Sequence, residues 1–174
     1  MEQGSDDKKI YRAEIASPLG ILRMVTDADS LLQVRFTDED RATFERTVDK
    51  GARPAILTST IRQLEEYFAG TRRDFDLKLA PKGTDFQGRT WETLTSIPYG
   101  KTISYLDLAR LLGDELSIRA AASANGKNPI AIIIPCHRVI GSNGDLTGYA
   151  GGLPRKKYLL DLEARTANGV QSLF

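Results

Sequence analysis

The sequence predicts an α/β (α+β) fold, with a small N-terminal domain of antiparallel strands plus helices and a mostly helical C-terminal domain. Three short segments with alternating apolar and polar residues lie between residues 10 and 36, separated by turn residues. Apolar residues at helical spacing dominate from residue 58 onward. The tripeptide Pro81-Lys82-Gly83 is the best linker candidate, so we expect one domain over residues 1–82 and a second over residues 83–174.

The N-terminal elements begin after a polar segment, residues 1–9, which we expect to be disordered. Segments 10–15 and 21–26 flank the turn Ser17-Pro18-Leu19-Gly20 and predict a β-hairpin, and segment 31–36 predicts a third strand. An acidic stretch at residues 38–40 opens a predicted helix that runs to about Lys50. Residues 74–80 predict either one more strand or an extended segment.

An amphipathic helix is predicted after Thr58 or Ser59, either of which can cap its N-terminus, and Gly70 is placed to end it. Its inward face consists of apolar and aromatic residues at helical spacing: Ile61, Leu64, Tyr67 and Phe68. Because burial alone explains such a pattern, we assign no chemistry to the N-terminal half.

The C-terminal half opens with a helix that Thr84 or Asp85 caps and that Pro98-Tyr99-Gly100 stops. Its inward residues are Phe86, Trp91, Leu94 and Ile97. A last helix is predicted near Pro154, because proline suits the first turn of a helix, and residues 165–174 are predicted to form a loose tail.

Two short helices are predicted between these longer ones. Ser104 caps the first, which Gly113 closes, and Ser117 caps the second, which Gly126 ends. Two short capped helices joined by a brief turn are typical of a helix-turn-helix. One interpretation is a DNA-binding helix-turn-helix. The other is a helix pair in which the second helix, rich in small residues, packs closely against the core, and the pattern alone does not decide between these interpretations.

The only cysteine and the only histidine stand side by side, as Cys136 and His137. The apolar run 130–134, rich in β-branched residues, predicts a buried strand that Pro135 ends. Cys136 then begins a turn or a helix, where His137, Arg138 and a helix N-terminus are expected to lower the pKa of the thiol. The alternative is a buried cysteine that serves as a small apolar filler. A filler needs neither the adjacent histidine nor the glycine-rich loop that follows.

Composition and charge narrow the classes of function. The hydrophobic fraction of 41% and charged fraction of 27% fit a soluble globular protein, and we expect no membrane partner and no signal peptide. One cysteine cannot form an internal disulfide, which favours the cytoplasm, and one cysteine with one histidine cannot supply a usual structural zinc site. The net charge is −1 over residues 1–82 and +2 over residues 83–174, and no acidic residue lies between Glu115 and Asp145. Such a small net charge would neutralise few phosphates of a nucleic acid, so we expect only modest affinity for DNA.

Several stretches together carry a specific resemblance to a known family. Pro135-Cys136-His137-Arg138-Val139, followed by Gly148-Tyr149-Ala150-Gly151-Gly152, resembles the active site of the O6-alkylguanine-DNA alkyltransferases, or methylated-DNA--protein-cysteine methyltransferases. Ile103-Ser104-Tyr105, Arg119-Ala120 and Asn125-Gly126-Lys127-Asn128-Pro129 match the family pattern in order and in spacing. The resemblance covers nearly all of residues 84–163 and implies a ribonuclease-H-like N-terminal domain.

The resemblance implies direct-reversal DNA repair in a single turnover. The alkyl group of O6-alkylguanine, with O4-alkylthymine as a further candidate, passes to the protein's own Cys136 after base flipping. His137 is implied as the base, acting through a bound water, and Glu163 as the residue that orients it. Tyr105 is implied as the donor to guanine O6, and Asn128 as the residue that fixes the turn at the cysteine. No cofactor and no metal is implied.

The resemblance also implies that the partner is double-stranded DNA containing the lesion, bound through its minor groove with Arg119 inserted into the base stack. The other residues assigned to DNA contact are Ala120, Ser104, Ser123 and Arg138. The residues assigned to the substrate pocket are Tyr149, Ala150, Gly151 and Pro135. Ala122-Ser123 stands where the family usually has glycine, which leaves the closeness of the DNA approach open. A monomer is expected, and cooperative binding along DNA stays open.

Two other classes of function remain open. A Cys–His hydrolase or acyltransferase normally takes its histidine from elsewhere in the chain, and an adjacent Cys-His pair is poorly placed for direct contact. Repeated turnover of an ester or thioester would favour that class. The other class is a helix-turn-helix binder without enzymatic activity, for which Cys136→Ala should leave every activity intact.

Overall fold

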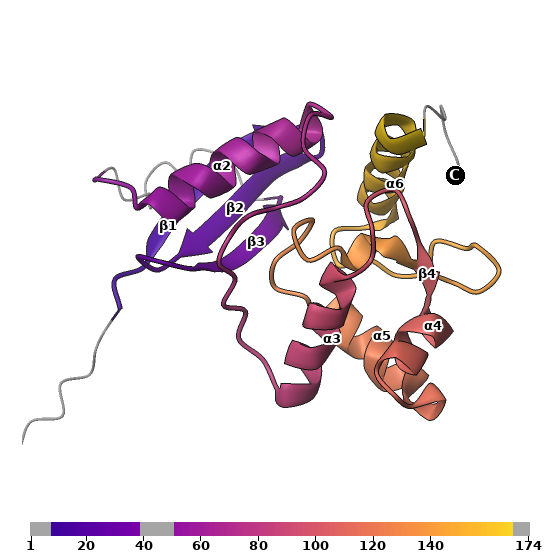
Figure 1. Ribbon diagram of the computed structural model, residues 1–174. Coiled ribbons are helices and arrows are strands. Elements are labelled where there is room, and N and C mark those ends of the chain that lie inside the picture. The colour runs from indigo at the N-terminus through magenta and orange to yellow at the C-terminus, as the bar shows by residue number, and fades with distance from the viewer. Residues whose placement is uncertain (1–7, 39–50, 169–174) are drawn as a thin grey trace, which may run out of the picture.

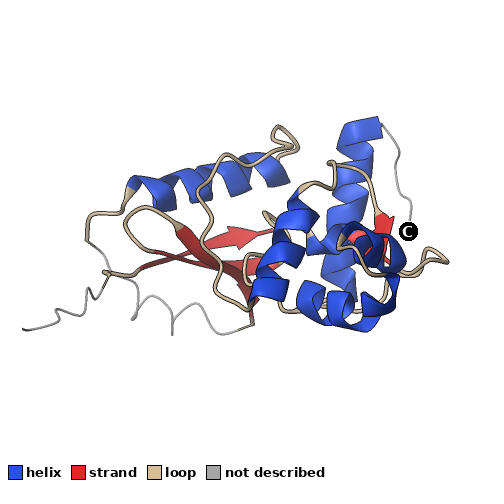
Figure 2. Ribbon diagram, turned by 60° about the horizontal axis from the view of Figure 1, so that its bottom comes forward, coloured by secondary structure: helices blue, strands red, loops and turns tan. Residues whose placement is uncertain are grey.

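The computed structural model describes residues 8–38 and 51–168, so the helix predicted over residues 38–50 lies outside the described residues except at its first position. The N-terminal half is a sheet with one long helix across it, and the C-terminal half is a group of helices beside that sheet (Figure 1, Figure 2). The predicted α+β fold class is confirmed.

The sheet consists of three antiparallel strands in the order β1-β2-β3. Strand β1 spans Tyr11–Ser17, β2 spans Gly20–Thr26 and β3 spans Leu31–Thr37. Ala13 pairs with Met24, which pairs with Val34, and all three are fully buried. One face of the sheet therefore packs on the core, as the alternation predicts. Residues 74–80 are extended and hydrogen-bond β3 only around Leu31, so they add no strand of their own.

Helix α2, Ala55–Phe68, lies across the sheet (Figure 1). Its N-cap is Pro54 and not Thr58 or Ser59, because the amides of Leu57 and Thr58 already bond the Pro54 carbonyl. The predicted cap is therefore wrong by one turn. Gly70 follows the helix end with φ +76°, a conformation that glycine adopts without steric cost, which confirms the predicted stop.

The C-terminal half contains the short helices that the sequence predicts. Helix α3, Asp85–Thr95, begins at a capping box between Thr84 and Gln87, and α4, Tyr105–Leu111, begins at one between Ser104 and Asp107. The short strands β4, Ile103–Ser104, and β5, Val139–Ile140, pair in parallel. The last helix, α6, spans Leu153–Asn168, so residues 165–168 are helical where a loose tail was predicted.

Helices α4 and α5 form the predicted helix-turn-helix. A 3₁₀ helix, η1, Glu115–Ser117, joins α4 to α5, Ile118–Gly126. Ser117 precedes α5, but its side chain caps nothing because its hydroxyl donates to the carbonyl of Asp114. The predicted capping bond at Ser117 is therefore wrong, although the position of the helix start is right.

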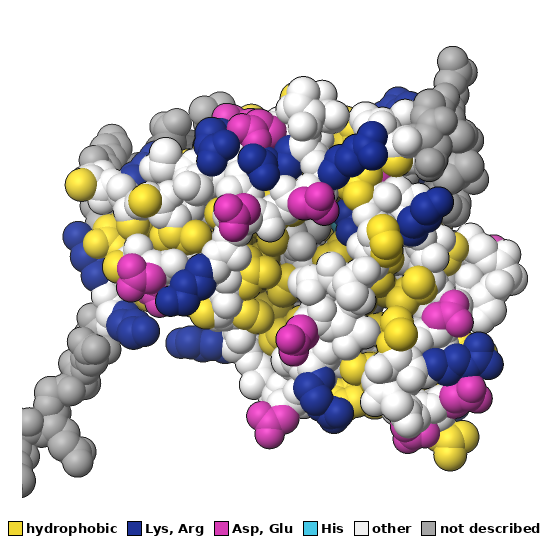
Figure 3. All heavy atoms as spheres, viewed as in Figure 1, with side chains coloured by type: hydrophobic (Ala, Val, Ile, Leu, Met, Phe, Trp, Pro, Cys, Tyr) yellow, Lys and Arg dark blue, Asp and Glu magenta, His cyan; other side chains and the backbone are white. Residues whose placement is uncertain are grey.

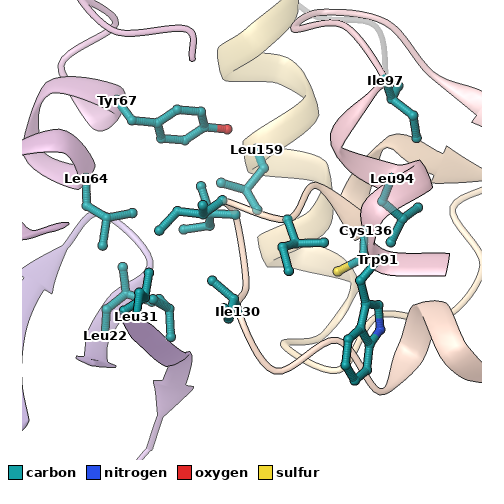
Figure 4. Packing of buried hydrophobic residues seen from close by; sticks show 14 of the residues in the cluster. Leu22, Leu31, Leu64, Tyr67, Trp91, Leu94, Ile97, Ile130, Cys136 and Leu159 are labelled. Carbon is teal, nitrogen blue, oxygen red and sulfur yellow. The ribbon is translucent and has the colours of Figure 1, made fainter. Parts of the chain in front are cut away.

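Apolar packing runs without interruption from the sheet into the helices. Figure 4 shows this cluster, in which Leu22, Leu31 and Leu64 lie on one side, Trp91 and Leu94 on the other, and Ile130 between them. On the face shown in Figure 3, basic and acidic side chains are interspersed, in keeping with a net charge of +1. Within the described ranges, no helix has both the length and the apolar character needed to cross a membrane.

Candidate active site

The segment that leads into Cys136 is buried, but it is not the strand that its composition predicts. Only Ile130 pairs with the sheet, through Val34, and residues 131–133 form a turn in which Ile132 has φ +71°. That conformation is a steric outlier for a β-branched residue and costs on the order of 1–3 kcal/mol. Residues 130–134 are apolar because they fill the core between the sheet and the helices, which composition alone does not distinguish from a strand.

Asn128 holds this turn together from its N-terminal side. Its side-chain oxygen accepts from the amide of Ile130 at 2.9 Å, and its side-chain nitrogen donates to the carbonyl of Ile134 at 2.7 Å. These bonds close the loop across the strained residue and fix the backbone just before Pro135 and Cys136.

Cys136 begins a three-residue 3₁₀ helix, η2, Cys136–Arg138, and is 7% exposed. Burial raises the pKa of its thiol, and the neighbouring Asn128 and Lys156 offset only part of that rise. The predicted lowering of the pKa is therefore wrong. A single 3₁₀ turn offers only a weak positive end, whereas burial disfavours the thiolate directly. The raised pKa favours the neutral thiol over the thiolate in Cys136.

Glu163 on α6 is the centre of a buried network of hydrogen bonds. Its Oε1 lies 2.7 Å from His137 Nε2 and also accepts from Arg138 Nη2 at 3.0 Å. Its Oε2 accepts from Arg138 Nε at 2.9 Å and from the amide of Gly100 at 3.2 Å. Burial alone would raise the pKa of Glu163, but its cationic and hydrogen-bonding partners hold that pKa well below its usual range. The lowered pKa favours the ionised carboxylate form of Glu163.

His137 is fully buried, and burial lowers its pKa even though Glu163 acts in the opposite direction. Its Nε2 is committed to Glu163, and its buried Nδ1 has no hydrogen-bond partner among the described residues. With His137 neutral, Arg138 is the cation that balances Glu163. His137 is therefore a neutral imidazole whose ring is held in one orientation by Glu163.

Arg138 does not reach the surface, so the prediction that it contacts DNA is wrong. It is 6% exposed, pairs with Glu163 and donates to the carbonyl of Ile97 at 2.6 Å. In the sequence, an arginine next to the cysteine could either contact DNA or pair with a buried carboxylate. Only the position of α6, which carries Glu163, distinguishes these two roles.

A cavity of about 990 Å³ opens onto Cys136. The predicted site residues that line it are Cys136, Tyr105, Arg119, Asn128, Tyr149, Ala150 and Gly151. Pro135 is buried and is not among the residues that line the cavity, which corrects its assignment to the pocket. Ser104 caps α4, while Ala120 and Ser123 are exposed on α5 outside the cavity lining.

Comparison with known proteins identifies the family. A family model described as 6-O-methylguanine DNA methyltransferase, DNA binding domain, matches residues 85–165, and the ribonuclease-like domain of the same description matches residues 10–81. The methylated-DNA--protein-cysteine methyltransferase of Methanosarcina acetivorans is 45% identical over 154 residues, which is 88% of this chain and 98% of the relative. This chain belongs to the 6-O-methylguanine DNA methyltransferase family.

Solved structures agree with this membership. The crystal structure of Mycobacterium tuberculosis O6-methylguanine methyltransferase matches with a TM-score of 0.80 at 41% identity, over 93% of this chain and 97% of that one. Mycobacterium tuberculosis OGT in complex with DNA matches with a TM-score of 0.79 at 42% identity, over 90% and 94% of the two chains. The predicted family is confirmed, and with it direct-reversal DNA repair by alkyl transfer to a protein cysteine.

Lys156 bonds the loop beside the cavity, which the sequence analysis did not foresee. Its side chain is fully buried, and Nζ donates to the carbonyls of Val139 at 2.7 Å, Thr147 at 3.0 Å and Gly148 at 3.2 Å. Burial lowers the pKa of Lys156 to about 8. Tyr105 donates to the same Thr147 carbonyl at 3.0 Å, so both side chains hold the loop that walls the pocket. Two adjacent lysines at a helix start look like a solvated face, and no signal in the sequence separates Lys156 from Lys157.

The N-terminal sheet also supplies part of the pocket, which the sequence analysis did not foresee. Val34, Arg35 and Phe36 of β3 line the cavity. The guanidinium of Arg155 lies 4.7 Å from the centre of the Phe36 ring and donates to the carbonyl of Gly151. A Cβ at Gly151 would lie 2.9 Å from the rings of both Phe36 and Tyr149, so only glycine fits between them.

Proposed function

We propose that the protein removes the alkyl group from O6-alkylguanine in double-stranded DNA and keeps it on Cys136. The observation that carries this proposal is a buried thiol at a cavity, adjacent in sequence to a neutral histidine that a buried carboxylate orients. Within a family of DNA alkyl-transfer proteins, that arrangement supports Cys136 as the acceptor.

The proposed reaction moves one proton and one alkyl group. His137 takes the proton from the Cys136 thiol, and Glu163 stabilises the imidazolium that results. The thiolate attacks the alkyl carbon, so that a sulfur–carbon bond forms as the bond from carbon to guanine O6 breaks. The electron pair left on guanine then takes up a proton. Overall, one proton moves from the thiol to guanine. Tyr105, at the cavity wall, is the proposed hydrogen-bond donor to O6, for which its hydroxyl must turn from the Thr147 carbonyl to the substrate.

DNA is proposed to approach through its minor groove along α5. Arg119 is exposed and lines the cavity, which supports the role of filling the space that a flipped nucleotide leaves. Ala120 and Ser123 are exposed on the same helix, and small side chains there allow close contact with the DNA backbone. Ser104 is proposed to contact DNA from the start of α4.

A single experiment tests the proposed chemistry. The protein is incubated with an excess of duplex DNA containing O6-methylguanine and then analysed by intact-mass and peptide mass spectrometry. We expect one methyl group per molecule, on Cys136, after which the reaction stops, and none on the Cys136→Ala variant. Continued turnover, or methyl on another residue, would contradict the proposal. Hydrolysis of an ester substrate without DNA would instead favour a Cys–His hydrolase.

A further inference from the structure

Glu163 receives a hydrogen bond from the N-terminal half of the chain as well as from its own half. The hydroxyl of Tyr67, on α2, donates to Glu163 Oε1 at 2.8 Å across 96 positions of sequence. Tyr67 is fully buried, and Figure 4 shows its hydroxyl pointing from α2 toward α6. The ring is held by Phe68 and Tyr99, each edge-on, and by Phe75. The hydroxyl is therefore fixed at the carboxylate by packing on several sides.

We propose that Tyr67 is a positioning residue for alkyl transfer, through which the N-terminal domain sets the basicity of His137 by way of Glu163. This inference rests on the proposed transfer to Cys136. Tyr67 touches neither the cysteine nor the cavity, so its action is indirect.

The effect follows from the oxygen that Tyr67 shares. Glu163 Oε1 accepts from Tyr67, His137 and Arg138, and each donor withdraws part of its negative charge. Removing the Tyr67 hydroxyl leaves more charge for His137, which stabilises the imidazolium and raises the pKa of His137. Because only neutral His137 can accept the thiol proton, the acid side of the rate profile should then move to higher pH.

Other charged and titratable groups act on the His137–Glu163 pair, and none of those named below substitutes for the hydrogen bond from the Tyr67 hydroxyl. Arg138, from η2, and Lys156, from α6, both oppose protonation of His137. Tyr99, from the loop after α3, faces the same cluster, but its hydroxyl bonds Thr166. Burial, with Glu163 beside it, raises the pKa of Tyr67 well above its ordinary value, so Tyr67 stays a donor throughout the working pH range.

The test measures alkyl transfer against pH in the full chain and in the Tyr67→Phe variant, which keeps the ring and removes the hydroxyl. We expect the acid midpoint to rise by about half a pH unit or more, which is a factor of about three in the protonation constant. His137 is the only histidine, so its imidazole NMR signals give its pKa directly and should shift by the same amount.

Tyr99→Phe is the matched control, because it removes a hydroxyl from the same aromatic cluster without removing a bond to Glu163. Its pH profile should stay at the wild-type position. A profile for Tyr67→Phe that is lower in rate but unmoved in pH would mean a purely structural role and overturn the inference. In the unaltered protein, the Tyr67 ring signals should shift as His137 titrates, and signals that do not respond would overturn it even if the variant folds poorly. Wild-type protein that transfers no methyl to Cys136 would instead refute the proposed function.

Discussion

The two halves of the chain differ in how much of the proposed site can be recognised from their sequences. The C-terminal half carries its proposed reacting residues in short, recognisable stretches, with Cys136 and His137 adjacent in sequence. The N-terminal half shows only amphipathic patterns, yet its Tyr67 bonds the central carboxylate and its strand β3 lines the cavity. Motifs in the sequence therefore point to the proposed reacting residues and, by resemblance, to Asn128 and Glu163, whereas only the fold brings Tyr67 and β3 to the same site.

The largest effect that this comparison predicts is at Glu163. Glu163→Gln removes the charge that orients His137 and leaves Arg138 buried without its partner. Breaking a buried pair in this way costs about 3–5 kcal/mol of the free energy of unfolding. Loss of the oriented base should also slow alkyl transfer by about 100-fold. Thermal unfolding and the rate of methyl transfer measure the two effects.

The same chemical change in the other half supplies the control. Glu65 is exposed on α2, and Glu65→Gln should alter unfolding by less than about 0.5 kcal/mol and leave transfer unchanged. If Glu65→Gln lowered the free energy of unfolding and the transfer rate as much as Glu163→Gln does, the effect of Glu163 would not come from its bonds to His137 and Arg138.

Local patterns in the sequence predict much of this molecule. The three strands, the stop at Gly70, the caps at Thr84 and Ser104 and the helix-turn-helix all follow from contacts between near neighbours in the chain. The proposed domain boundary between residues 82 and 83 stays a prediction, and the apolar cluster is continuous across it.

The errors have a common cause, which is contact with residues distant in sequence. The run 130–134 looked like a strand because a buried turn and a buried strand have the same composition. Arg138 looked like a DNA contact because nothing local shows that it pairs with Glu163 on α6, and the thiol looked activated because nothing local shows that it is buried. Tyr67 was assigned to the core correctly, but its partner lies 96 residues away.

A smaller effect is predicted at Arg119, and it depends on the substrate. Arg119→Ala should slow repair of O6-methylguanine in duplex DNA by about tenfold or more, because base flipping costs a few kcal/mol and its support is lost. Reaction with a free alkylguanine base, which needs no flipping, should be almost unchanged. Arg110→Ala is the control, since Arg110 pairs with Glu115 away from the cavity. Equal loss on both substrates would argue against the role of Arg119 in flipping. Tyr105→Phe should slow both substrates.

The smallest effect is predicted where the two halves meet at the pocket. Arg155 donates to the carbonyls of Leu19 and Gly151 and stacks on Phe36, so it ties the pocket loop to the sheet. Its ion pair with Asp38 adds little, because the Asp38 side chain is 88% exposed. Arg155→Met keeps the apolar stem and should lower the free energy of unfolding by about 1 kcal/mol.

The distinctive result at Arg155 is local. Amide hydrogen exchange should accelerate over residues 148–152 in Arg155→Met while the sheet stays protected, because the loop loses its attachment to β3. In the control Arg62→Met, the lost partner lies within α2, where an i,i+4 pair is worth only about 0.5 kcal/mol or less, and the pocket loop should exchange as in the wild type. Unchanged exchange at residues 148–152 in Arg155→Met would mean that Tyr105 and Lys156 hold the loop alone. The N-terminal sheet would then be a wall beside the pocket and not a support for it.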